Sequence, residues 1–136
     1  MALLTDLIGL GLPPEQAVKV GTPTIDALPV WPASAALTAT GSTITDALLL
    51  TGSVNNVATA AAGTGVKLNP NTPIGATVVV RNGGANDLKL YPTGALDIIN
   101  GGTGGAAITL TTLSKQIATC TRVSSTLWVT TVATGT

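Results

Sequence analysis

The residues that most often do chemistry are few in this chain, and they form no catalytic pattern. Histidine is absent, which removes the commonest general base and the commonest metal ligand. The six acidic residues are spread through the sequence without an evident acid/base pair: Asp6, Glu15, Asp26, Asp46, Asp87 and Asp97. We predict that the chain is not an enzyme, uses no cofactor and takes no small-molecule substrate.

Two motifs resemble known site sequences but lack their context. Residues 101–105 are rich in glycine, yet a strand-like run follows them, whereas a phosphate loop ends in Lys-Ser/Thr and opens a helix. We interpret them as a flexible loop. Ser114-Lys115 lacks the Ser-x-x-Lys spacing, because position 112 is Thr, and a serine hydrolase would also need a histidine.

Three further features have two interpretations each. Asn86, Asp87 and Asp97 offer oxygen ligands suited to Ca²⁺, but Asn86-Asp87 more simply stabilises a turn. Cys120 lies in an alternating run, so we expect a buried strand residue rather than a reactive thiol, which needs a nearby cation. Threonines alternate at 38–45 and 109–111, as on ice-binding surfaces, but without a fixed repeat length. Threonine is also common on exposed strand faces.

The composition indicates that much of the surface is buried against other chains, or is covered by Thr, Ser, Asn and Gly, or both. Hydrophobic residues make up 45% of the sequence, but charged residues only 9%, against a usual value of about 25%. Net charge is zero and the cations are scattered, which argues against nucleic-acid binding. No apolar run approaches the roughly 18 residues of a membrane span, and the first residues do not resemble a signal peptide. We expect synthesis in the cytoplasm of the producing cell and no membrane partner.

Periodicity predicts a β-domain over residues 34–136, organised around a β-hairpin at 76–92. Residues 77–81 are mostly β-branched, residues 88–91 alternate, and Asn-Gly-Gly-Ala-Asn-Asp lies between them as a turn. Further strands are expected within 38–50, 54–62, 66–68, 96–99, 107–110, 116–122 and 127–132. Short strands at spacings near ten residues predict an all-β, antiparallel sandwich or barrel of seven to nine strands.

Residues 1–33 differ in character and predict an arm of two short helices and a linker. Residues 2–10 carry an apolar helical stripe that is too short to be stable alone. Residues 13–21 begin with Pro-Pro-Glu and end with glycine, as a second short helix does. Three prolines within 22–33 indicate an extended linker. Trp31 either folds onto its own domain or anchors the arm in a partner.

The order of these parts resembles the head decoration (cement) and head-fibre proteins of tailed bacteriophages. The arm at 7–21 is similar to the apolar helical arms that begin such proteins. Residues 75–92, Ile98-Ile99-Asn100-Gly101 and Trp128 are similar to a β-module of phage structural proteins. The resemblance implies a jelly-roll-like homotrimer on the outside of the virion capsid, where it stabilises the shell.

On this reading, the arm binds the major capsid protein through apolar side chains. The residues expected at that contact are Leu3, Leu4, Leu7, Ile8, Leu12, Val18 and Trp31. A tail or head fibre that binds a host receptor glycan is the alternative, and it would carry exposed Trp128 or Tyr91 near its distal loops. An enzyme and a secreted adhesive or ice-binding module are the remaining alternatives from other classes.

Overall fold

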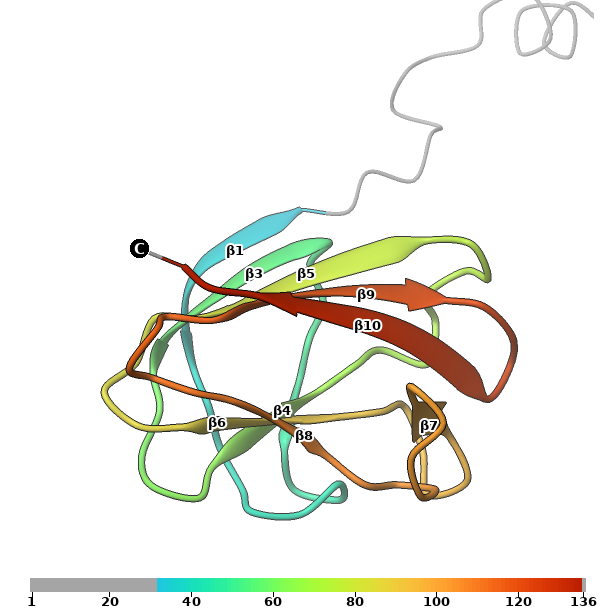
Figure 1. Cartoon of the computed structure of the whole chain (residues 1–136), viewed down its shortest axis with the longest axis horizontal. Helices are drawn as coiled ribbons and strands as arrows, with labels where there is room; N and C mark the ends of the chain where they lie inside the picture. The colour runs from blue at the N-terminus through green and yellow to red at the C-terminus, as the bar shows by residue number, and fades with distance from the viewer. Residues whose placement is uncertain (1–31, 136) are drawn as a thin grey trace, which may run out of the picture. The chain divides into compact units, whose positions relative to one another are not determined.

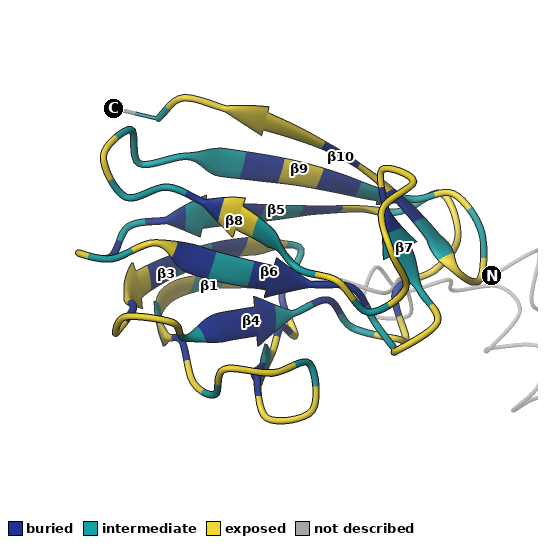
Figure 2. Cartoon of the chain, turned by 60° about the horizontal axis from the view of Figure 1, so that its bottom comes forward, coloured by how far each residue is buried: buried dark blue, intermediate teal, exposed yellow. Residues whose placement is uncertain are grey.

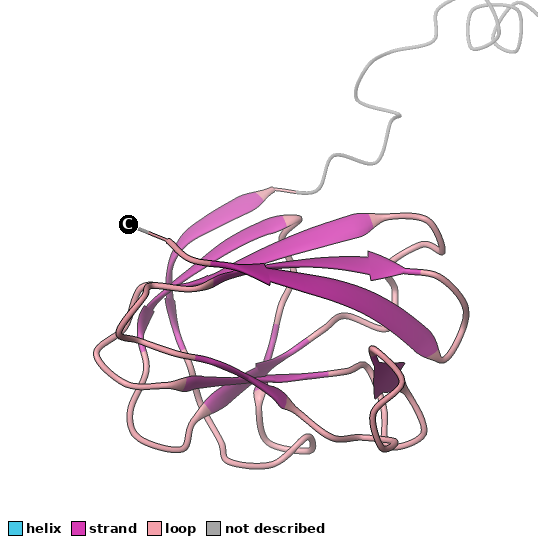
Figure 3. Ribbon diagram, viewed as in Figure 1, coloured by secondary structure: helices cyan, strands magenta, loops and turns pink. Residues whose placement is uncertain are grey.

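The computed structural model describes residues 32–135, and these residues form an all-β domain (Figures 1 and 3). The predicted all-β class is confirmed for this part of the chain. It contains ten strands, one more than the upper end of the predicted range, and no helix. The strands are β1 (Ala33–Thr38), β2 (Leu48–Leu49), β3 (Val54–Thr59), β4 (Gly65–Lys67), β5 (Thr77–Asn82), β6 (Leu88–Tyr91), β7 (Ile98–Ile99), β8 (Ile108–Leu110), β9 (Ile117–Arg122) and β10 (Leu127–Ala133).

The strands form two sheets, and both sheets are mixed. The larger sheet has the order β1-β3-β5-β9-β10-β7 and the smaller has the order β2-β4-β6-β8. Strands β1, β3 and β5 run parallel, as do β2, β4 and β6. The prediction of antiparallel sheets is wrong, because the first eight strands alternate between the two sheets. Strands consecutive in sequence therefore do not pair until β9 and β10.

The predicted hairpin at 76–92 is also wrong, although both of its strands exist. β5 pairs with β3 and β9, whereas β6 pairs with β4 and β8 in the other sheet. The loop between them crosses from the larger sheet to the smaller one. Asn82, which is fully buried at the end of β5, holds this loop by hydrogen bonds. Its Nδ2 donates to the carbonyls of Asn86 (2.9 Å) and Leu110 (2.8 Å), and its Oδ1 accepts from Gly84 N (3.0 Å).

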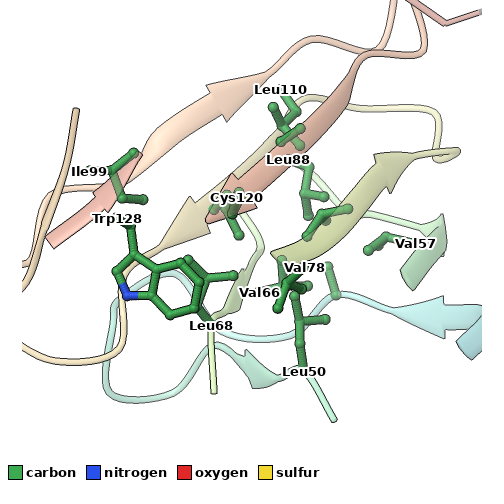
Figure 4. Packing of buried hydrophobic residues seen from close by; sticks show 14 of the residues in the cluster. Leu50, Val57, Val66, Leu68, Val78, Leu88, Ile99, Leu110, Cys120 and Trp128 are labelled. Atoms are coloured by element: carbon green, nitrogen blue, oxygen red, sulfur yellow. The ribbon is translucent and has the colours of Figure 1, made fainter. Parts of the chain in front are cut away.

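One apolar core lies between the two sheets, and both sheets contribute to it (Figure 4). Alternation along each strand sends every second side chain inward. The largest fully buried side chain is Trp128 of β10, and the chain contains no phenylalanine. Leucine and valine supply most of the rest: Leu50, Leu68, Leu88, Leu90, Leu110, Val57, Val66, Val78 and Val80.

The region 38–50 contains less strand than its alternation predicts. Only Leu48–Leu49 forms a strand, and the preceding residues form a turn around Asp46. The Asp46 Oδ1 atom accepts from Thr43 Oγ1 (2.6 Å), Thr43 N (2.8 Å) and Ser42 N (3.1 Å). These bonds, the Thr43 hydroxyl above all, lower the pKa of Asp46 below its ordinary value of 3.8. The Asp46 carboxylate thus accepts hydrogen bonds from backbone N–H groups that would otherwise pair with a neighbouring strand.

Candidate interaction surfaces

The predicted capsid-contact residues lie outside the described part of the chain. These are Leu3, Leu4, Leu7, Ile8, Leu12, Val18 and Trp31. The two predicted helices and most of the linker lie outside it as well. Their role stays a prediction, and the candidate surfaces below belong to residues 32–135.

The outer face of the larger sheet is wide and almost uncharged. Two cross-strand rows run over it, Val54–Val79–Thr119–Thr131 and Thr77–Thr121–Val129. A third row, Asn56–Arg81–Ile117–Ala133, carries the one charged side chain that points outward on this face among the described residues. We call this surface the Thr–Val face and define it by Val54, Thr77, Val79, Thr119, Thr121, Val129 and Thr131.

Large apolar side chains stand open to solvent on the Thr–Val face. Val54 is 50% exposed and Val129 is 45% exposed, and Thr119 and Thr131 are exposed too. Figure 2 shows exposed positions on β9 and along β10 of this sheet. Thr77 and Thr121 are joined across β5 and β9 by a hydroxyl–hydroxyl contact of 3.0 Å. No described segment of the chain covers these residues.

Arg81 is held at the border of this face rather than in its centre. Its Nη1 donates to Asn56 Oδ1 (2.9 Å), and Asn56 Nδ2 donates in turn to the Ala35 carbonyl in β1 (2.8 Å). The Arg81 guanidinium is thus held in place by a hydrogen bond to the uncharged amide of Asn56. The rest of the face presents only methyl and hydroxyl groups.

Strand β1 extends the same surface as an edge strand. It pairs with β3 on one side and with no described strand on the other. Its six residues, Ala33–Thr38, contain no charge, and the register shifts twice, between Ser34 and Leu37 and between Leu37 and Thr38. Edge strands usually carry charges, prolines or β-bulges that hinder pairing with other chains. β1 has the register shifts but no charge or proline, which makes it a candidate interaction edge.

The smaller sheet has a different outer face. Lys67 and Lys89 project from β4 and β6, and the turn around Asp46 covers part of the rest. The Tyr91 hydroxyl donates to the Ser42 carbonyl at 2.5 Å, and its ring lies against Gly65, where an added Cβ would come within 2.8 Å. Tyr91 is thus buried on an outer face by the chain's own loop.

One end of the domain gathers polar loop residues around a shallow depression of about 330 Å³. Its lining comes from the β3–β4, β5–β6 and β8–β9 loops: Ala62, Gly63, Ala85, Asn86, Asp87 and Thr112. Asn86 Nδ2 donates to Ala60 O (2.8 Å) and Asp87 Oδ1 accepts from Thr112 N (2.9 Å). Asn86 and Asp87 were predicted to stabilise a turn of their own, but these bonds instead join the β5–β6 loop to the two neighbouring loops.

Lys115 lies at the same end of the domain and contacts the β5–β6 loop. Lys115 adopts a positive φ of 45° and its Nζ donates to Gly84 O (2.8 Å) and Gly83 O (3.3 Å). A carboxylate, an amide and a hydroxyl around a hollow can hydrogen-bond a hydroxylated ligand. Within residues 32–135 no three His, Cys, Asp or Glu side chains are close enough to hold a metal ion.

The remaining chemistry-bearing residues have structural positions. Cys120 is fully buried on β9, as predicted, and desolvation raises the pKa of its thiol to about 11, so it stays protonated at neutral pH. Residues 101–105 form a loop followed by β8, also as predicted. Trp128 and Tyr91, which a receptor-binding fibre was expected to expose, are both buried.

Sequence reasoning missed the Thr–Val face itself. The signal was present in 117–133, where both phases of the strand alternation are free of acidic residues and one phase is threonine-rich. Arg122 is the one charged residue in this stretch, so neither strand has a charged face to present to water.

Comparisons with known proteins returned no relative. No family model, no curated protein and no solved structure matches the chain. In the described part, no helix is long and apolar enough to cross a membrane.

Proposed function

We propose that this chain is a virion structural protein of a tailed bacteriophage, a capsid decoration protein that binds the outside of the head as a homotrimer. The two sheets would then be a small jelly-roll-like sandwich, and three such domains would stabilise the shell. The observation that supports the proposal is the Thr–Val face together with the low charge of the whole chain: only 9% of the residues are charged, whereas a soluble single chain normally carries roughly 25–35% charged residues on its surface.

The arm supplies attachment in this proposal. Residues 1–33 bind the major capsid protein by burying the apolar stripe and Trp31. Each fully buried aliphatic side chain contributes roughly 1.5–3 kcal/mol. Three arms on one trimer act together, so a modest affinity per arm gives firm attachment through high effective concentration. The chain is found on the virion exterior after synthesis in the host cytoplasm.

Binding to emptied phage heads tests this function. The full chain is expected to coat heads and raise their resistance to heat, and a variant lacking residues 1–31 is expected to lose head binding. This deletion ends before Pro32, whose carbonyl accepts from Ser53 N, so β1 keeps its contact. Circular dichroism checks the fold of the shortened chain. If that variant is folded and still coats heads, the proposed role of the arm is wrong.

A head or tail fibre that binds a receptor glycan is the second candidate. The polar depression beside Asn86, Asp87 and Thr112 favours it, since hydroxyl groups of a sugar need such partners. Burial of Trp128 and Tyr91 removes the aromatic platform that this role was expected to use. Binding of the full chain to host cells but not to heads would favour the fibre.

A further inference from the structure

We infer that the Thr–Val face, together with the edge of β1, is the surface through which copies of this chain associate. The inference rests on the homotrimer of the proposed function and assigns its interface. The occupant is a second copy of the chain. Three observations lead to it: the distribution of charge, the state of the edge strand, and the size of the face.

The lack of charge on this face favours a partner surface that is also uncharged. A charged group brought against it would lose hydration and find only Arg81, which already bonds Asn56. Elsewhere on the described domain, outer surfaces carry charges: Lys67 and Lys89 on the smaller sheet, Asp87 and Lys115 at the polar end, Asp97 and Arg122 at the opposite end. Of the two outer sheet faces that the structure describes, the uncharged one is therefore the Thr–Val face with the adjoining β1.

The edge of β1 fits a protein strand or a flat sheet better than other ligands. A free edge presents unpaired backbone donors and acceptors, which another strand can satisfy. On a single chain an uncharged edge of six residues beside exposed valines is an aggregation hazard. In a closed ring the same groups are covered and the hazard disappears.

The size of the face explains why the edge of β1 belongs to the same surface. Strands lie about 4.8 Å apart and rise about 3.3 Å per residue, so four strands of six residues cover roughly 400 Å². A stable contact buries about 800 Å² on each partner. The face alone supplies about half of that area, so a lasting contact between copies also buries β1.

Charge reversal on the face tests the inference in the full chain. Thr119→Glu places a carboxylate at the centre of the face, and Val129→Glu places one nearer the start of β10. Thr109→Glu is the matched control, because Thr109 is exposed on the outer face of β8 and pairs in register with Lys89. Native mass spectrometry measures the mass, and circular dichroism confirms the fold of each variant.

The two face variants are expected to raise the concentration at which the oligomer dissociates by about a hundredfold or more, because an unpaired carboxylate would be buried. Thr109→Glu is expected to leave it unchanged. If the native chain forms an oligomer that Thr119→Glu and Val129→Glu do not weaken, this inference is wrong while the proposed function stands. If Leu7→Glu dissociates the oligomer and Thr119→Glu does not, residues 1–31 make the contact and the inference is equally overturned. A native chain of single-chain mass would contradict the proposed homotrimer itself.

Discussion

The two sheets treat their outer faces in opposite ways. The smaller sheet puts Lys67 and Lys89 into water and covers Tyr91 with the loop around Asp46. The larger sheet leaves the Thr–Val face without a covering loop and confines its outward charge to Arg81. The chain has the means to protect an outer face and uses them on one side only. In the proposed homotrimer, a neighbouring copy would protect the larger sheet.

The largest effect in this comparison is expected on the inner side of the larger sheet. Asn82→Ala removes a buried amide that ties β5 to Leu110 of β8, leaving the Leu110 carbonyl and the Gly84 N–H without that partner. The expected loss is about 2–4 kcal/mol of unfolding free energy, measured by urea denaturation.

Asn56→Ala is the matched control on the outer side of the same sheet. Its amide is partly exposed and water can replace its bonds to Arg81 and Ala35, so the expected cost is under about 1 kcal/mol. Equal losses for the two variants would mean that the inner and outer sides of this sheet do not differ in the way described.

A smaller effect is expected where the chain covers its own smaller sheet. The folded state lowers the pKa of Asp46, so its stabilising contribution is complete above the ordinary value of 3.8 and is lost as pH falls through the folded pKa. Hydrogen exchange of the Ser42 and Thr43 amides is expected to speed up at acid pH relative to the exchange of β9 amides, after correction for intrinsic rates. Asp46→Asn is expected to show that faster exchange already at neutral pH. Amide protection that is independent of both pH and Asp46 would contradict this role.

Sequence patterns predicted the fold class and most strands because alternation and turn residues are local signals. Residues 77–81 and 88–91 are strands as expected, and Cys120 is buried as expected. The pairing of those strands was predicted wrongly, since after Asn82 the chain crosses to the other sheet. The buried amide contacts Leu110, 28 positions away, and no local pattern contains that information.

The candidate surface was harder to predict than the core. Apolar residues at inward positions indicate burial, but Val54, Val129 and Thr119 look like ordinary strand residues in the sequence. Only the register of β3, β5, β9 and β10 places them in adjacent rows. The charge deficit in the composition predicts that some surface is covered, and only the topology shows which sheet face lacks charge.

Thiol protection on β9 tests most directly whether another copy covers the larger sheet. Thr119→Cys puts a thiol on the outer face, and Thr109→Cys puts one on the smaller sheet. Buried Cys120 stays protonated and shielded in both variants. We predict that Ellman's reagent reacts at position 119 at least about tenfold more slowly than at position 109 when the protein is concentrated, and that dilution removes the difference. Equal rates at every concentration, in a chain that remains folded, would contradict the account.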